Sequence, residues 1–192
     1  MNSGKYIFTQ IADLIKMTPF RKLVKKYRGD YRAHDLTCYN QFLHLLFGQL
    51  SSCTSLRDIC LCLKAHESSL FHMGFGNTVD HTTLSRANEK RDYHIYEELG
   101  CFLIKTIRPL YANEKLDEVD TDLRLLALDS TTISVSLKLC AWALGKYERG
   151  DIKMHTLLDL RGSIPVQIHI SDWRSHDSNM LDKLTIEPYA MY

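Results

Sequence analysis

The chain has 192 residues, of which 45% are hydrophobic and 24% are charged, and its formal net charge at pH 7 is +1. This balance is typical of a soluble globular protein and excludes an intrinsically disordered chain. The longest apolar stretch, residues 42–50, is far shorter than the ~20 residues that a membrane-spanning helix requires. The first residues are too polar for a signal peptide. We therefore expect a cytoplasmic protein that does not contact the membrane.

The charge is unevenly distributed along the chain. Residues 1–64 hold ten Lys and Arg against four Asp and Glu, whereas residues 65–192 hold fourteen against nineteen. A nucleic-acid-binding module joined to a metal-using module would show this asymmetry, and so would two ordinary domains with differently charged surfaces.

None of the six cysteines forms a C-x-x-C pair, so we expect reduced thiols.

The first third of the chain has the apolar spacing of helices. One segment covers residues 7–15, and a second opens at Pro19 and ends at Gly29. The second segment is strongly basic, which suits either a phosphate backbone or a plain solvated helix face. Its candidate DNA-binding residues are Arg21, Lys22, Lys25 and Lys26.

Further helices are predicted over residues 39–50, 56–66, 82–88 and 93–111. The short helix at 82–88 follows a turn at 74–77 and carries polar residues on its outer side. This arrangement is compatible with a helix-turn-helix that presents Ser85, Arg86 and Asn88 to DNA, or with a simple helical hairpin.

The composition changes near residue 112, where an acidic, polar stretch indicates a linker. After it, strands are predicted over residues 123–128, 152–160 and 164–170, followed by a helix over 175–184 and the start of a strand at 189–192. The fold class is therefore α+β, with helices first and a sheet second.

Asp129 is the most suggestive residue for chemistry. It is predicted to end the first strand, where a carboxylate can be held rigidly and still reach a hard cation such as Mg²⁺. Paired Mg²⁺ ions could clamp both reacting oxygens of a phosphodiester, but one Asp cannot assemble such a site. A strand-end Asp is also a common turn residue.

Lys153 and His155 share one face of the next strand, where they either point toward Asp129 and bind DNA or face solvent. A zinc site at His155, His169 and His176 has no standard ligand spacing.

Taken in order along the chain, the motifs resemble bacterial insertion-sequence transposases of the DDE class, in the branch grouped with insertion sequence four. The resemblance is carried by F-G-Q-L-S at 47–51, S-L-R-D-I at 55–59, L-S-R-A-N-E-K-R-D-Y at 84–93, L-A-L-D-S-T-T-I at 126–133, D-I-K-M-H-T-L-L-D at 151–159 and S-H-D at 175–177.

This resemblance implies a helical DNA-binding domain followed by an RNase H-like catalytic domain. It makes Asp129 the first catalytic carboxylate and an Mg²⁺ ligand, and it places Lys153 and His155 on the second strand. The implied partner is DNA, at the terminal inverted repeats of the element, and the implied location is the nucleoid. The expected organisation is a basic helical domain (1–75), a helical DNA-binding extension (76–112), an acidic linker (113–122) and a partial RNase H-like domain (123–192).

The sequence departs from the family at its end. The second Asp, at the end of the fourth strand, and the later Glu of the family are not present, so the domain is expected to comprise only its first three strands and first helix. We therefore expect a transposase fragment that binds DNA but lacks catalysis by itself, as a homo-oligomer or in mixed complexes with full-length transposase. Two alternatives stay open: a stand-alone DNA-binding or interfering protein, and a helical interaction module without a DNA role.

Overall fold

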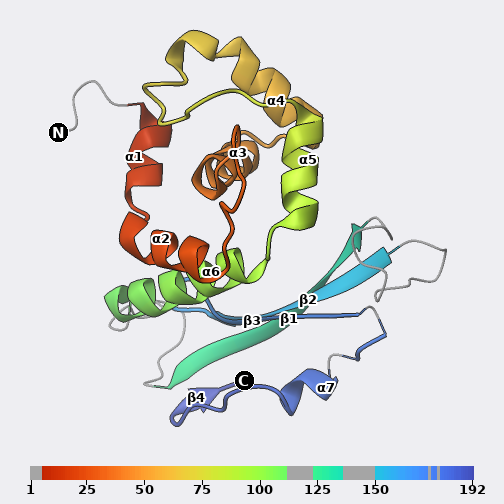
Figure 1. The fold of residues 1–192 in the computed structure, drawn as a ribbon. Coiled ribbons are helices and arrows are strands. Elements are labelled where there is room, and N and C mark those ends of the chain that lie inside the picture. Colours follow the sequence, from red (N-terminus) through yellow and green to blue (C-terminus); the bar gives the residue numbers. More distant parts are fainter. Residues whose placement is uncertain (1–5, 112–122, 136–149, 173, 177) are drawn as a thin grey trace. The chain divides into compact units, whose positions relative to one another are not determined.

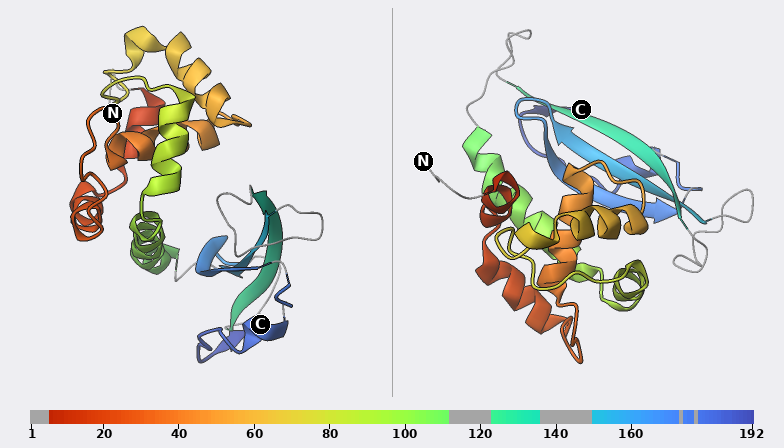
Figure 2. Two further views of the ribbon diagram at one scale, coloured as in Figure 1. Left: turned by 45° about the vertical axis from the view of Figure 1, so that its right-hand side comes forward. Right: turned by 90° about the horizontal axis from the view of Figure 1, so that it is seen from above.

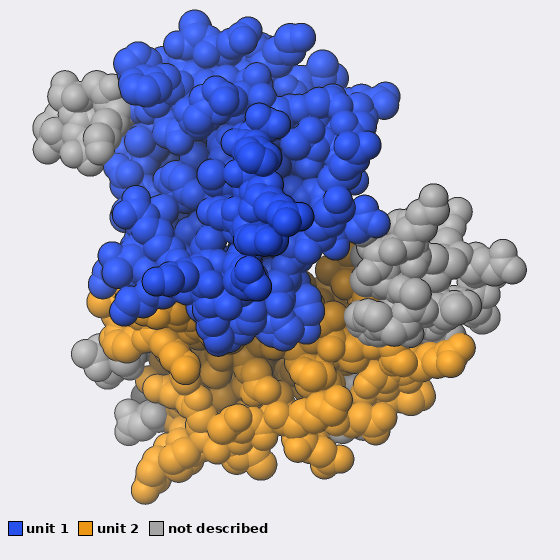
Figure 3. Space-filling model, in the orientation of Figure 1, with its two compact units in different colours: residues 1–100 blue, residues 101–192 orange. Residues whose placement is uncertain are grey.

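The computed structural model describes residues 6–111, 123–135, 150–172, 174–176 and 178–192. The chain divides into two compact units, residues 1–100 and residues 101–192, which are coloured separately in Figure 3. The predicted acidic linker at 113–122 lies outside the described residues. The predicted helical extension at 76–112 contributes to both units, because their boundary falls within a helix.

The first unit is helical, as the spacing of apolar residues predicts. In Figure 1, α3 lies in the middle of the unit, with α1, α2, α4 and α5 around it. The central helix accordingly buries seven of its residues. The helices are α1 (Ile7–Asp13), α2 (Met17–Lys26), α3 (Cys38–Leu50), α4 (Leu56–Ala65), η1 (Glu67–Ser69), α5 (His81–Lys90) and α6 (His94–Ile107), and α6 continues into η2 (Arg108–Tyr111) in the second unit.

Side-chain caps start three of these helices. The hydroxyl of Thr37 accepts from the backbone N–H of Asn40 at 3.1 Å, and Ser55 caps α4 in the same way at 3.1 Å. The Asp80 carboxylate accepts from the first turn of α5. Such caps satisfy backbone donors that have no partner inside the helix. They explain why these helices begin where the sequence places polar residues.

An aromatic cluster forms the core of the helical unit. The ring of Phe8 stacks on that of Phe75 with centroids 5.4 Å apart and meets the edge of Phe47 at 5.8 Å. Leu43 is fully buried beside them in the same cluster. Burial of these rings holds α1 and α3 and the loop around Phe75 together.

The second unit contains a four-stranded sheet in the order β3-β2-β1-β4. Its three long strands pair in antiparallel fashion, and Figure 2 shows their twist. The fourth strand runs parallel to the first, with Arg124 opposite Ala190 and Leu125 opposite Met191. The strands are β1 (Arg124–Val135), β2 (Gly150–Asp159), β3 (Ile164–Asp172) and β4 (Ala190–Met191), with α7 (Ser178–Leu181) between the last two.

Two elements differ from the sequence prediction. The first strand does not end at Asp129 but runs on to Val135, because residues 126–135 pair with β2 and because Thr131, Thr132 and Ile133 favour extended backbone. The helix predicted over 175–184 forms only the single turn α7. Asp129 therefore lies in the middle of a strand.

The two faces of the sheet have different surroundings. One face bears His155 and Leu157, both buried, and carries the segment around α7. Contacts of this segment include Lys153 Nζ to the Ser175 carbonyl at 3.2 Å and Gln167 Nε2 to the Lys183 carbonyl at 3.2 Å. The other face bears Asp129.

None of the described helices is both long and apolar enough to cross a membrane. The five described cysteines carry free thiols, as predicted, and Cys140 lies outside the described residues. Burial raises the pKa of the Cys38 thiol to about 12. This thiol therefore behaves as a small apolar core group.

Candidate nucleic-acid interface and carboxylate site

The basic residues of α2 are exposed, but they do not share one role. Arg21, Lys22 and Lys25 project into solvent. Lys26 instead donates to Glu98 of α6 at 2.6 Å, and the Tyr27 hydroxyl donates to the same carboxylate oxygen. The hydrogen bond from Lys26 is the main cause of the lowered pKa of Glu98. Lys26 thus joins α2 to α6, which leaves three cations of the predicted row available to a ligand.

The predicted recognition residues of α5 also divide. Ser85 and Arg86 are exposed and have no described partner, as the helix-turn-helix interpretation requires. Asn88 is also exposed, but its Oδ1 accepts from Gln41 Nε2 at 2.5 Å. Asn88 is therefore partly committed to the internal structure of the unit.

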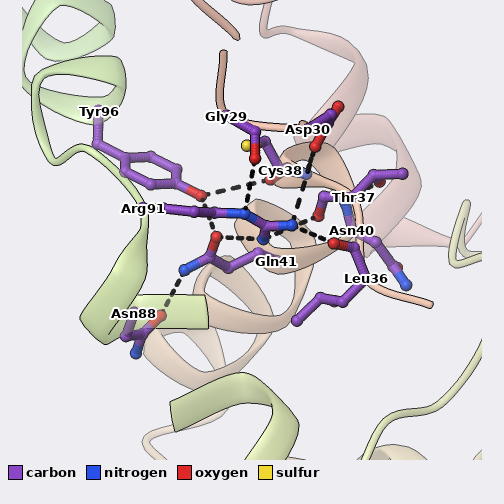
Figure 4. Close-up of polar contacts among 10 residues, drawn as sticks. All are labelled: Gly29, Asp30, Leu36, Thr37, Cys38, Asn40, Gln41, Asn88, Arg91 and Tyr96. Atoms are coloured by element: carbon purple, nitrogen blue, oxygen red, sulfur yellow. Dashed lines mark hydrogen bonds and ion pairs between the residues drawn. The ribbon is translucent and has the colours of Figure 1, made fainter. Parts of the chain in front are cut away.

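Arg91 is the polar centre of the helical unit (Figure 4). Its guanidinium donates to the carbonyl oxygens of Gly29 at 3.2 Å and Leu36, and at 3.4 Å to that of Thr37. It also donates to Gln41 Oε1 at 2.5 Å. The Arg91 side chain is only 10% exposed, so these bonds form in a poorly solvated place. They fix residues 29–37 against α3 and the end of α5.

Residues around Arg91 complete the network. The Tyr96 hydroxyl donates to Gln41 Oε1 at 2.9 Å, and the Asp30 carboxylate accepts from the Cys38 N–H at 2.6 Å. Sequence reasoning did not identify this network. A usable signal was the run of polar residues Asn40, Gln41 and His44 within a helix rich in apolar residues, because buried amides require hydrogen-bond partners.

The structure does not bring Asp129 together with Lys153 and His155. In the antiparallel ladder Asp129 lies opposite Thr156, whereas His155 lies opposite Ser130. Neighbouring positions of a strand point to opposite faces, so Asp129 is on one face and the two basic residues are on the other.

His155 is also inaccessible to a ligand. It is 1% exposed, and its Nε2 lies 2.9 Å from the hydroxyl of Ser171. Its ring centroid is 6.4 Å from that of His169. In this geometry His155 packs against β3, and its predicted contact with DNA does not fit its burial. Lys153 binds the segment that covers this face.

Asp129 is exposed on its face of the sheet. Across the described residues, no three His, Cys, Asp or Glu side chains gather closely enough to hold a metal ion. The neighbour of Asp129 across the ladder is the hydroxyl residue Thr156 rather than a second carboxylate. The described residues alone therefore do not make up an Mg²⁺ site, and no described zinc triad forms around His155.

A charged cluster joins three parts of the sheet unit. Glu187 Oε2 accepts from Arg108 Nη2 and from Arg124 Nη1, both at 2.6 Å, and Arg124 Nε lies 3.4 Å from Asp159 Oδ2. The hydrogen bond from Arg108 is the main cause of the lowered pKa of Glu187. This cluster holds the segment before β4 against β1 and η2.

Comparison with known proteins finds similarity to one protein family and to one protein named as a putative transposase. Residues 3–76 match a family described as a domain of unknown function (DUF4372). The chain is 29% identical over 174 residues to a protein of Synechocystis sp. named "Putative transposase for insertion sequence element IS4SA". The match covers 88% of this chain and 45% of that protein, so the chain spans less than half the length of this relative. No solved structure matches the chain.

Proposed function

We propose that this chain is the DNA-binding and first catalytic portion of an insertion-sequence transposase of the DDE class. The observation that carries the proposal is the place of Asp129, exposed in the middle of β1, in a chain related to a transposase over most of its length. The helical unit would bind the ends of the element, and the sheet unit would supply one carboxylate for DNA cleavage and strand transfer.

The strand order supports an RNase H-like assignment. That fold has its first strand near the centre of the sheet, and here β1 lies between β2 and the parallel β4. Leu125 pairs with Met191. If β4 continued in this register in a longer protein, the residue opposite Asp129 would come four positions after Met191. A carboxylate there would adjoin Asp129, which is the arrangement that a shared Mg²⁺ requires.

The carboxylate role can be tested in a protein that extends beyond this chain, in a cellular transposition assay. Asp129→Asn should abolish transposition because it removes a charged metal ligand while conserving the size of the side chain. The matched control is Asp182→Asn, at an exposed position near α7, which should transpose normally. Normal transposition by Asp129→Asn would contradict the proposed role. The 192-residue chain alone should bind DNA without cleaving it.

The DNA-binding role rests on Arg21, Lys22 and Lys25 of α2 and on Ser85 and Arg86 of α5, all of which are exposed. Its test is the affinity of the whole chain for duplexes with and without the terminal repeats, measured over a range of salt concentrations. Affinity should fall steeply with salt and favour the repeats. Equal affinity for unrelated DNA would contradict the sequence-specific version.

A second candidate function is interference with transposition. The exposed cations of α2 belong to the helical unit and do not require a complete catalytic site, so a chain of this length could occupy element ends without cutting them. Coexpression with a full-length transposase distinguishes the two functions: interference lowers transposition through mixed complexes or competition for the ends, whereas an inert fragment leaves it unchanged.

A further inference from the structure

A hollow of about 490 Å³ lies between the segment of residues 27–36 and helix α5. We call it the α5 groove. Its two walls contribute four cations, Arg28 and Arg32 from the segment and Arg86 and Lys90 from the helix, in addition to Arg91, which is already engaged in the network described above. All four are exposed, and within the described part of the chain none of them is in an ion pair.

The acidic residues of the α5 groove do not balance these cations. Two carboxylates line it, Asp35 and Asp92. Asp92 already accepts from the backbone and the ring of His94, at 3.0 and 2.6 Å. The groove therefore carries a positive charge that comes from both of its walls, which suits an anionic ligand.

On the side of the groove formed by residues 27–36, both arginines stack on the ring of Tyr31. The guanidinium carbon of Arg28 lies 4.6 Å from the ring centroid of Tyr31, and that of Arg32 lies 5.2 Å from it. Tyr31 is 60% exposed, so this stack is on the surface. Stacking on an aromatic ring restricts a guanidinium and leaves its N–H groups free to bind phosphate oxygens.

The backbone of this wall is strained where the two arginines attach. Arg28 and Arg32 have φ angles of 51° and 56°, in the left-handed region that is unfavourable for a long side chain. Arg91 holds both ends of the segment through the carbonyl oxygens of Gly29 and Leu36. The buried network thus keeps two arginines in a fixed position before any ligand arrives, which lowers the entropy that binding costs.

The cations also form a track rather than a single site. Arg28 and Tyr31 line a second hollow, of about 580 Å³, whose wall includes Arg21 and Lys25 of α2. The α5 groove and the exposed row of α2 are therefore continuous. A line of cations matches a polyanion with regularly spaced charges better than it matches one small anion.

We propose that the α5 groove binds the phosphate backbone of duplex DNA, with Arg28 and Arg32 on one wall and Arg86 and Lys90 on the other. This inference rests on the proposed function and adds to it the place and the residues of contact. The arginines would make bidentate bonds to phosphate oxygens, and these bonds would set the position of the helical unit on DNA.

The test measures the affinity of the whole 192-residue chain for a labelled duplex by fluorescence anisotropy at several salt concentrations. One variant combines Arg28→Asn and Arg32→Asn, because asparagine tolerates left-handed backbone better than most residues. The other combines Arg86→Gln and Lys90→Gln on the exposed surface of α5, where folding is not at risk. The control, Arg57→Gln with Lys64→Gln, removes two exposed cations from α4.

Each groove variant should bind more weakly on every duplex and reduce the slope of log affinity against log salt by about 2, since each phosphate contact contributes about 0.9. The α4 control should keep the slope of the unmodified chain. If the α5 variant binds like the control while Arg21→Gln with Lys25→Gln loses affinity, the groove inference is wrong and the DNA-binding function stands. If the unmodified chain itself has no salt-dependent affinity for DNA, the proposed function fails as well.

Discussion

Among single residues, Arg91 carries the largest share of polar structure in the helical unit. Replacing it with alanine would leave the carbonyl oxygens of Gly29 and Leu36 without this donor, in a place with little solvent. The Thr37 carbonyl and Gln41 Oε1 would each lose one of their two donors. We expect Arg91→Ala to lower the free energy of unfolding by about 2–4 kcal/mol, as measured by urea denaturation. Arg91→Lys should restore little of the lost stability, because one ammonium group cannot make the several directed hydrogen bonds of the planar guanidinium. Arg86→Ala, at an exposed position of α5, should change stability by less than about 0.5 kcal/mol.

His44 makes the stability of the helical unit depend on pH. Its side chain is fully buried in α3, with Nδ1 2.7 Å from the Asn40 carbonyl oxygen, and burial lowers its pKa. Below about pH 6.5 the unfolded chain takes up a proton that the folded chain does not, so stability is present at neutral pH and decreases on acidification.

The expected slope for His44 is at most about 1.4 kcal/mol per pH unit, and it should persist until the lowered folded pKa is reached. His44→Asn keeps a donor near the Nδ1 position and should remove this part of the pH dependence in urea denaturation. The exposed His66 serves as the control, and His66→Asn should leave the dependence as it is. An unchanged pH profile for His44→Asn would show that other groups cause it.

Between helices, the contact of α3 with α4 depends on a glycine. A Cβ atom on Gly48 would lie 2.3 Å from Cδ1 of the buried Ile59, whereas a Cβ atom on Gly100 in α6 would meet nothing within 4 Å. Alanine in a helix is favoured over glycine by about 1 kcal/mol. We therefore expect Gly100→Ala to stabilise the protein by about that amount. Gly48→Ala should destabilise it by about 1–2 kcal/mol through overpacking. Thermal unfolding of the two variants should shift in opposite directions.

In the sheet unit, the ion pairs of Glu187 with Arg108 and Arg124 join β1 to the segments beside it, and their contribution to stability can be tested. Hydrogen bonding from Arg108 lowers the pKa of Glu187 in the folded protein. The contribution of the Glu187 carboxylate to the free energy of unfolding is therefore complete above about pH 4.3, and it is lost as the pH falls through the lower pKa of the folded state. Glu187→Gln should cost about 1 kcal/mol at neutral pH, since the cluster is only partly buried. It should cost almost nothing in strong acid. Glu89→Gln, on the exposed side of α5, should change stability little at either pH.

For the whole molecule, the two units should unfold separately because each has its own buried core. Both tryptophans, at positions 142 and 173, fall within residues 101–192, while most of the helix lies within residues 1–100. Tryptophan fluorescence and circular dichroism at the helix band should therefore give different denaturation midpoints. Glu187→Gln should shift mainly the fluorescence midpoint, and Gly48→Ala mainly the dichroism midpoint. Coincident midpoints in every variant would show a single cooperative unit.

Local patterns determined much of this architecture. The 3.6-residue spacing of apolar side chains located the helices, and the polar residues before α4 marked its start. The alternating and β-branched residues located β2 and β3, and the helical and sheet halves followed from the change in composition near residue 112. These features depend on neighbours within a few positions, so a single sequence contains them.

Only the tertiary structure decided which side chains meet. The register of β1 with β2 places Asp129 on the face opposite His155, a relation set by hydrogen bonds between strands that are distant along the chain. Arg91 reaches carbonyl oxygens more than fifty positions away, and it thereby fixes the strained segment that carries Arg28 and Arg32. Long-range pairing of this kind leaves no periodic trace in the sequence, so the residues that carry chemistry could be identified by type but not assembled into sites.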